Sequence, residues 1–186
     1  VVCPWCLIGK RRLERALEAT PELDVELVFR SFELDPNQTP LPAGSDLADV
    51  LARKYGMSRD KALGMMSHVA AQAAEEGVTF DFDAQKRESG TFDAHRLLQL
   101  AVTLSPALQI SLKDRLMRGW FCEGRSVRDL ASLRSIAVES GLPEDQVDAV
   151  LADPSAFADA VRHDEAEART LGISGVPYFV IDRHFG

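Results

Sequence analysis

The chain has 186 residues and a net charge of −8, from 29 acidic and 21 basic residues, and 46% of its residues are hydrophobic. A chain of this length can bury a core without covalent staples, and its three cysteines are too few for a disulfide scaffold. The acidic balance argues against nucleic acid, whose binding needs clustered Lys and Arg, and no apolar run approaches the roughly twenty residues that cross a bilayer. We therefore expect a globular domain with neither nucleic acid nor a membrane as its partner.

Two cysteines open the chain in the run Cys3-Pro4-Trp5-Cys6, and the following residues have the pattern of an amphipathic helix with Gly9, Leu13 and Ala16 on its buried face. Positions three apart share a helix face, so Cys3 and Cys6 can close a disulfide with little backbone movement. The helix start offers free N–H groups and the positive end of the dipole to the first sulfur, which favours the thiolate. This spacing predicts a redox pair, with Cys3 as nucleophile and Cys6 as resolving thiol.

A Cys-x-x-Cys can also be half of a zinc site, but zinc needs two more ligands, and no second Cys or His pair follows. We expect no metal and keep a zinc-binding or interaction module as a non-enzymatic alternative. The remaining candidate ligands are isolated from one another: His68, His95, His163, His184 and Cys122, the last predicted to be a small core residue. The basic run Lys10-Arg11-Arg12 is expected to form a solvated helix face.

After the first helix, residues 24–34 alternate polar and apolar side chains, which predicts a half-buried strand. Pro40, Pro42 and Gly44 then mark a boundary. Beyond it the pattern is mainly helical, with a stop and restart at Gly141-Leu142-Pro143-Glu144. The predicted helices cover residues 45–55, 58–74, 92–101, 110–121, 127–138 and 157–171.

The last helix is followed by Gly172, a residue suited to a C-terminal cap. The run Ile173-Ser174-Gly175-Val176-Pro177-Tyr178-Phe179-Val180-Ile181-Asp182 then predicts a loop that leads into a buried strand. No internal repeat or low-complexity segment interrupts this order.

Four motifs in this order resemble the DsbA family of thioredoxin-fold oxidoreductases, and within it the cytoplasmic FrnE-like branch. They span nearly the whole chain: Val2-Cys3-Pro4-Trp5-Cys6 with Gly9-Lys10, Phe32-Glu33-Leu34-Asp35-Pro36, Thr91-Phe92-Asp93-Ala94-His95-Arg96, and Gly172-Ile173-Ser174-Gly175-Val176-Pro177-Tyr178-Phe179.

The resemblance implies an α/β fold, a thioredoxin-like core interrupted by a large all-helical insertion. The core is expected at residues 1–44 and 154–186 and the insertion at 45–153. It also implies that the Val176–Pro177 bond is cis and that this loop lies against the two cysteines. The thioredoxin core has a strand before the first helix, and only Val1-Val2 precede it here, so the chain is expected to be trimmed at both ends.

The predicted function is thiol–disulfide exchange, as a DsbA-like protein-disulfide oxidoreductase or isomerase. Cys3 and Cys6 are the expected catalytic residues, and Pro4, Trp5, Val176 and Pro177 the expected substrate-binding residues, with Val176 offering its backbone to an extended substrate. The expected partner is a disulfide- or thiol-containing protein or small molecule, in the cytoplasm, with no resident cofactor.

Glutathione is a candidate reductant or co-substrate. The related kappa-class glutathione transferases and 2-hydroxychromene-2-carboxylate isomerases use it, and they typically carry Ser where this chain has Cys3. A glutathione-dependent transferase or isomerase is therefore the second alternative, with His95 and Arg96 as candidate polar residues of its site. Direction of exchange and oligomeric state are not indicated by the sequence.

Overall fold

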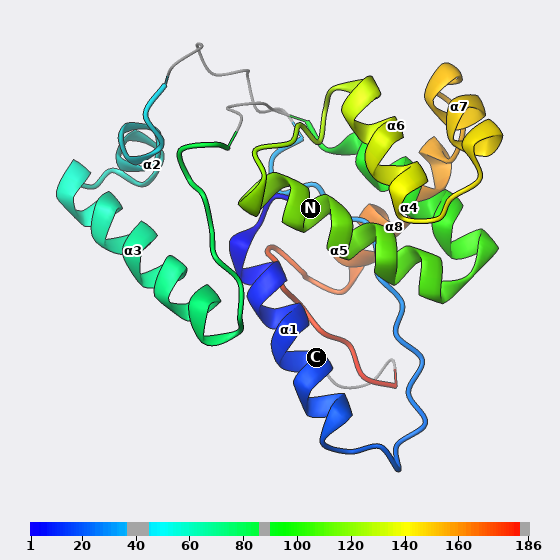
Figure 1. Ribbon diagram of the computed structural model, residues 1–186, viewed down its shortest axis with the longest axis horizontal. Helices are drawn as coiled ribbons and strands as arrows, with labels where there is room; N and C mark the ends of the chain where they lie inside the picture. Colours follow the sequence, from blue (N-terminus) through cyan, green and yellow to red (C-terminus); the bar gives the residue numbers. More distant parts are fainter. Residues whose placement is uncertain (37–44, 86–89, 183–186) are drawn as a thin grey trace.

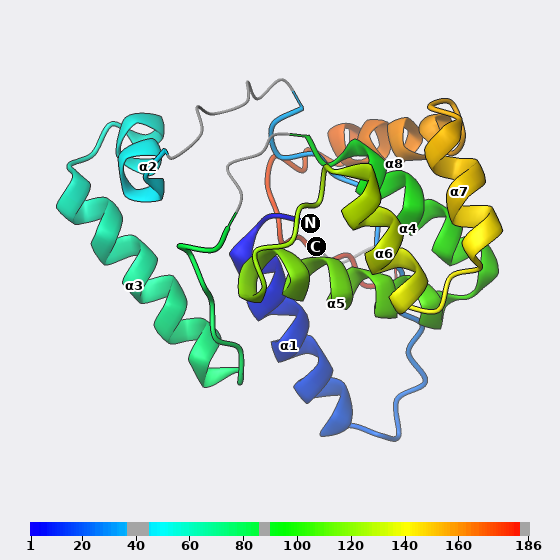
Figure 2. The same ribbon diagram turned by 45° about the horizontal axis from the view of Figure 1, so that its top comes forward.

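The computed structural model describes residues 1–36, 45–85 and 90–182. Helix α1 stands between two groups of helices, the α2–α3 hairpin on one side and the α4–α8 group on the other (Figures 1 and 2). The helices of the described residues are α1 (Pro4–Glu18), α2 (Leu47–Tyr55), α3 (Arg59–Glu75), α4 (Phe92–Leu104), α5 (Pro106–Cys122), α6 (Leu130–Glu139), α7 (Glu144–Ala152) and α8 (Ala158–Thr170).

The helix ends follow the local capping signals of the sequence. The Asp46 carboxylate accepts the N–H groups of Ala48 and Asp49 at the start of α2, and the Ser58 hydroxyl accepts that of Lys61 at the start of α3. Past the end of α8, Gly172 has a φ of 70°, in the left-handed region that favours glycine. The predicted starts of α2 and α3 and the predicted glycine stop after α8 are confirmed.

The core lies mainly between α4, α5 and α6, whose fully buried side chains include Leu97, Leu112, Leu116 and Ile136. Helix α1 joins this core with other residues than the sequence pattern indicated. Its buried apolar side chains are Leu7 and Ile8, whereas Leu13 is half-buried and Ala16 is exposed. The prediction for Ala16 was wrong, because the apolar residues of α1 are covered at Leu7 and Ile8 and not at the position of Ala16.

Residues 24–34 were predicted as a half-buried strand, but none of them belongs to a strand ladder, and the apolar side chains of Val25, Val28 and Leu34 are 48%, 41% and 50% exposed. Helix side chains take the place of a neighbouring strand. The side-chain amide of Gln109 in α5 accepts the N–H of Phe29 at 2.9 Å and donates to the Phe29 carbonyl at 2.9 Å. The Asp164 carboxylate in α8 accepts the N–H of Ser31 at 2.7 Å. Side chains of α5 and α8 thus satisfy backbone groups at Phe29 and Ser31, and Ser31 is buried.

The final segment differs from its prediction as a buried strand. The side chains of residues 178–181 are between 45% and 62% exposed, and a single bridge at Ile181 is the only ladder residue that the described ranges contain. In Figure 1 this segment passes beside α1, where Phe179 lies against Gly9. The prediction of burial was wrong because the side chains meet packing partners among the described residues on one side only.

Helices α2 to α7 all fall between residues 45 and 153, in agreement with an all-helical insertion. The boundary expected at Pro40, Pro42 and Gly44 lies outside the described residues, and the division into 1–44, 45–153 and 154–186 stays a prediction. Within the described ranges, no helix combines the length and the apolar character that crossing a bilayer demands.

Candidate active site

The first cysteine sits at the N-cap of α1. Its backbone is extended, with φ −93° and ψ 119°, and Pro4 takes the first helical position, where a missing N–H costs nothing. The N–H of Cys6 donates to the Cys3 carbonyl at 3.1 Å and closes the first turn. Both thiols are free; Cys3 is buried and Cys6 half-buried. The Cys-x-x-Cys therefore lies at a helix start, as its spacing predicts.

A second segment completes the site from the far end of the chain. The Val176–Pro177 peptide bond is cis, which confirms that prediction. The Cys3 thiol donates to the Val176 carbonyl oxygen at 3.5 Å. A Cβ placed on Gly9 would lie 3.4 Å from Cγ of Pro177, so the proline ring lies against α1 with room for a methyl group and for no larger side chain. The cis-proline loop and the dithiol thus form one site.

The two thiols have opposite acidities. A hydrogen bond from the Cys6 side chain lowers the pKa of Cys3 to about 6, against the effect of burial, and the N–H groups of Cys6 and Trp5 act in the same direction. The same hydrogen bond raises the pKa of Cys6, and burial raises it further. At neutral pH the pair therefore holds one proton, on Cys6, and one negative charge, on Cys3. This division matches a nucleophile and a resolving thiol.

The other two residues of the motif face outward. Pro4 is half-buried, and Trp5 is 37% exposed. The indole ring of Trp5 lies 6.0 Å from the imidazole ring of His68, measured between centroids. His68 belongs to α3, so the helical hairpin borders the exposed side of the dithiol. The sequence pattern did not connect His68 with Trp5, because the two residues are distant in the chain.

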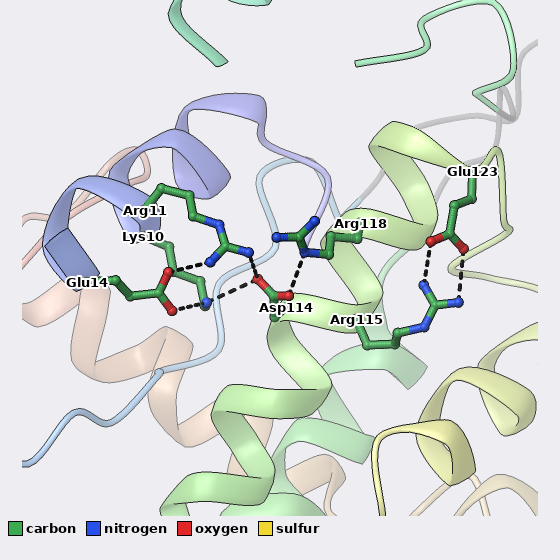
Figure 3. A network of polar contacts seen from close by, with 7 residues as sticks. All are labelled: Lys10, Arg11, Glu14, Asp114, Arg115, Arg118 and Glu123. Atoms are coloured by element: carbon green, nitrogen blue, oxygen red, sulfur yellow. Dashed lines mark hydrogen bonds and ion pairs between the residues drawn. The ribbon is translucent and has the colours of Figure 1, made fainter. Parts of the chain in front are cut away.

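The basic run after the motif is only in part the solvated face that was expected, since Arg12 is exposed and Lys10 is buried. Lys10 is 3% exposed and pairs with Glu14 and with Asp114, the latter at 3.1 Å. Arg11 pairs with the same two carboxylates, and Arg118 reaches Asp114 at 2.7 Å (Figure 3). The expectation for Lys10 failed because Asp114 of α5, a half-buried residue 104 positions away, provides a partner for its ammonium.

Lys113 is a candidate functional residue that the sequence did not single out. It lies in α5, is 8% exposed, and holds its ammonium nitrogen 5.4 Å from the centroid of the Phe29 ring. Burial lowers its pKa, and negative charge on Cys6 and Cys3 opposes that effect. One lysine in an amphipathic helix is ordinarily a surface residue, so no local signal marked it.

His95 and Arg96, the polar candidates of the transferase-like alternative, are both buried in the described core. Arg96 donates to the carbonyls of Ala156, Val150 and Asp153 and pairs with Asp93 at 2.6 Å. Its guanidinium is thus occupied at the connection between α7 and α8. Burial lowers the pKa of His95 well below its ordinary value, which makes it a neutral core residue.

The residues considered as metal ligands do not gather. Across residues 1–36, 45–85 and 90–182, no three His, Cys, Asp or Glu side chains form a group suited to a metal ion, and His184 lies outside these ranges. Cys122 is half-buried against the core, where desolvation raises its pKa, as expected of a packing thiol.

A shallow groove of about 550 Å³ lies toward the other end of α1, with Leu17, Val25 and Ile110 among its lining residues. Neither Cys3 nor Cys6 lines it. We place the chemistry at the dithiol, because the lining residues of this groove include no cysteine, histidine or lysine.

Comparison with known proteins gives the family. The profile of the DSBA-like thioredoxin domain matches residues 1–186. Among solved structures, the chain is similar to a probable DsbA oxidoreductase from Streptomyces coelicolor, with 45% sequence identity, a TM-score of 0.87, and coverage of 98% of this chain and 77% of that one. No curated protein matches the sequence significantly. The chain therefore belongs to the DsbA-like thioredoxin family of oxidoreductases, with a large helical insertion in its thioredoxin-like fold.

Proposed function

We propose that this oxidoreductase exchanges disulfides through Cys3 and Cys6. The observation that carries the proposal is the arrangement of Cys3. Its sulfur lies at a helix start and faces the backbone of the cis-proline loop at Val176. The lowered pKa of Cys3 favours its thiolate form. A thiol with this acidity is largely ionised at neutral pH, and in the oxidising direction its thiolate is a good leaving group when a second substrate thiol attacks the substrate sulfur of the mixed disulfide.

The exchange has two steps. The Cys3 thiolate attacks one sulfur of a substrate disulfide, a new S–S bond forms, and the second substrate sulfur leaves as a thiolate that takes a proton from water. Cys6 then loses its proton and attacks the Cys3 sulfur. The Cys3–Cys6 disulfide forms and the first substrate sulfur leaves with the displaced electron pair. In the oxidising direction the same steps run backward.

The cis-proline loop is suited to hold the substrate chain during these steps. Val176 presents its carbonyl oxygen next to Cys3, and this oxygen loses its thiol donor when Cys3 ionises. It can then accept an N–H of an extended substrate, as in strand addition. Pro4, Trp5 and Pro177 are proposed to form the surrounding contact surface, since Trp5 and Pro177 are exposed and Pro4 is half-buried. A substrate with an extended segment beside its cysteine fits this surface.

Replacement of Cys3 tests the proposal. A Cys3→Ser variant is expected to lose dithiol oxidation and insulin reduction. Cys122→Ser removes the remaining cysteine outside the motif and is the matched control, expected to keep both activities. Full activity of the Cys3→Ser protein would disprove the assignment of the nucleophile.

Equilibration of the intact protein in glutathione buffers measures the potential of the Cys3–Cys6 pair. The result separates an oxidant from a reductant or an isomerase, because their dithiol potentials differ. Calorimetric titration of glutathione into Cys3→Ser addresses the transferase-like alternative, since tight binding without the thiol would favour it.

A further inference from the structure

The indole of Trp5, between the two cysteines of the motif, packs against a histidine of α3. The ring centroids of Trp5 and His68 lie 6.0 Å apart, and the ring planes make an angle of 50°. This separation lies within the range in which aromatic side chains attract one another. Trp5 is 37% exposed, and His68 is exposed as well. Two accessible rings therefore form a pair at the start of α1, next to the dithiol.

Polar contacts further along the same two helices hold α3 in register with α1. Arg12, about two turns after Trp5, pairs with Glu76 at 2.9 Å and donates to the Gln72 side chain at 2.7 Å. Gln72 follows His68 by four positions, so both lie on the same side of α3. The two helices thus run in the same direction along this contact. The place of His68 beside Trp5 is therefore set by the packing of the helices as well as by the rings.

Helix α3 extends past the start of α1. The first residue of α1 is Pro4, whereas α3 begins at Arg59, about two turns before His68. The two helices diverge toward this end (Figures 1 and 2). Apart from the local backbone of α3, no described atom lies within 4 Å of a Cβ placed on Gly64, one turn before His68. The first half of α3 thus leaves free space next to the ring pair.

The dithiol therefore lies between two elements that a substrate can contact. The Val176 carbonyl oxygen lies 3.5 Å from the Cys3 sulfur, and α3 borders Trp5 through His68. A small disulfide needs only the Cys3 sulfur. A polypeptide that binds along the Val176 backbone is broad enough to cover the indole as well. The indole offers a large contact area with few rotatable bonds, which suits an apolar side chain.

We propose that His68 is a positioning residue: it holds the Trp5 indole as the contact for an apolar side chain next to the cysteine of a polypeptide substrate. This inference rests on the proposed function and assigns polypeptides as its substrate class. An exposed indole without a packing partner moves among rotamers, and its immobilisation on binding costs free energy. The contact with His68 removes part of this cost in advance. It acts on substrate binding and leaves the chemistry of the dithiol unchanged.

Kinetics with two disulfides of different size test this role. The reduced protein is mixed in single-turnover experiments with a disulfide-linked peptide that carries leucine next to its cysteine, and separately with 2-hydroxyethyl disulfide. In His68→Ala, the half-saturating peptide concentration should rise about fivefold at an unchanged limiting rate, because a binding contribution is lost. The rate with 2-hydroxyethyl disulfide should stay within about twofold. His68→Phe, which keeps an aromatic ring, should restore peptide binding.

His163→Ala is the matched control, because His163 is an exposed histidine on another helix, α8. Its half-saturating peptide concentration should equal that of the unmodified protein. Equal values in the two alanine variants would overturn the proposal. The same holds for an equal fall of both disulfide rates in His68→Ala, or for a His68→Phe protein that binds the peptide no better than His68→Ala.

A spectroscopic measurement tests the ring contact independently of the kinetics. The chain has two tryptophans, Trp5 and Trp120, so labelling with 5-fluorotryptophan gives one ¹⁹F resonance for each, and Trp5→Phe assigns them. The Trp5 resonance should shift in His68→Ala and stay in place in His163→Ala. An unchanged Trp5 resonance in His68→Ala would overturn the proposal. Failure of the proposed function is distinct, since the unmodified protein would then reduce neither disulfide.

Discussion

The sulfur of Cys3 lies 3.5 Å from the carbonyl oxygen of Val176, which is 173 positions later in the sequence. The nucleophile and the proposed substrate-binding backbone are therefore held together by the packing of the last segment on α1, where Pro177 lies close to Gly9. The predictions below test the acidity of this site and the contacts that hold its parts in place.

The acidity of Cys3 depends on the side chain of Cys6. In Cys6→Ala the pKa of Cys3 should rise from about 6 toward its ordinary value, because the hydrogen bond that contributes most to the thiolate is lost. Cys6→Ser keeps a hydroxyl donor and should retain part of the effect. Iodoacetamide alkylation at pH 7 should be about tenfold slower in the alanine variant. Equal alkylation rates of Cys3 in Cys6→Ala and in the unmodified protein would refute this explanation.

Cys3 reactivity should also fall on the acid side of neutrality. In the unmodified reduced protein, the thiolate fraction is nearly complete well above pH 6 and decreases about tenfold for each pH unit well below it. The rate of alkylation between pH 4 and 8 measures this dependence. A midpoint near the ordinary thiol value of about 8.5 would contradict it.

Gly9 should tolerate a methyl group and reject a large side chain. In Gly9→Ala the new Cβ would meet Pro177 and Phe179 at ordinary contact distances of 3.4 to 3.6 Å. The helix should gain up to about 1 kcal/mol, with exchange activity kept. Gly9→Leu should push Pro177 away from Cys3 and lower the exchange rate about tenfold or more, while circular dichroism shows an intact helical protein. Normal exchange by the leucine variant would show that this packing does not position the loop.

Asp164 should be important for stability. Its carboxylate accepts the N–H of Ser31 at 2.7 Å and the amide of Gln99 at 2.6 Å, and it pairs with Arg30. Asp164→Ala leaves buried donors without an acceptor and should lower the free energy of unfolding by about 3 kcal/mol in urea titrations. The exposed Glu167→Ala on the same helix is the control. A similar small loss in both variants would contradict the role of Asp164.

Arg96 should act on stability and have no direct part in ligand binding. Arg96→Lys cannot reach Asp93 and the carbonyls around Ala156 together, and should lower the free energy of unfolding by about 3 to 5 kcal/mol. The exposed Arg134→Lys, which also breaks a forked ion pair, should change stability little. A stable Arg96→Lys protein with weakened glutathione binding would instead support the transferase-like alternative.

The parts of the structure that the sequence predicted depend on local chemistry. Pro4 and the helix-start position of Cys3 follow from capping preferences, as do the starts of α2 and α3 at Asp46 and Ser58. The cis bond before Pro177 was implied by family motifs, because a single X–Pro pair in a sequence does not specify its isomer.

The parts that the sequence missed depend on contacts between distant segments. Lys10 was assigned to solvent because its partner Asp114 lies in another helix, and Lys113 carried no signal because its surroundings come from α1 and the segment around Phe29. The alternation of residues 24–34 predicted a half-buried strand, which these residues do not form. It could not indicate that side chains of Gln109 and Asp164 would satisfy this backbone.

The amide of Gln109 binds both the N–H and the carbonyl of Phe29. The Gln109 side chain therefore fixes the position of Phe29, and Asp164 fixes that of Ser31, two positions later. The connection between α1 and Phe29 can change in length by a residue without loss of these hydrogen bonds, because Phe29 and Ser31 both lie after the connection. An insertion between Phe29 and Ser31 would instead force one of the two anchors to release. This short interval is thus the part of the segment where chain length itself is constrained.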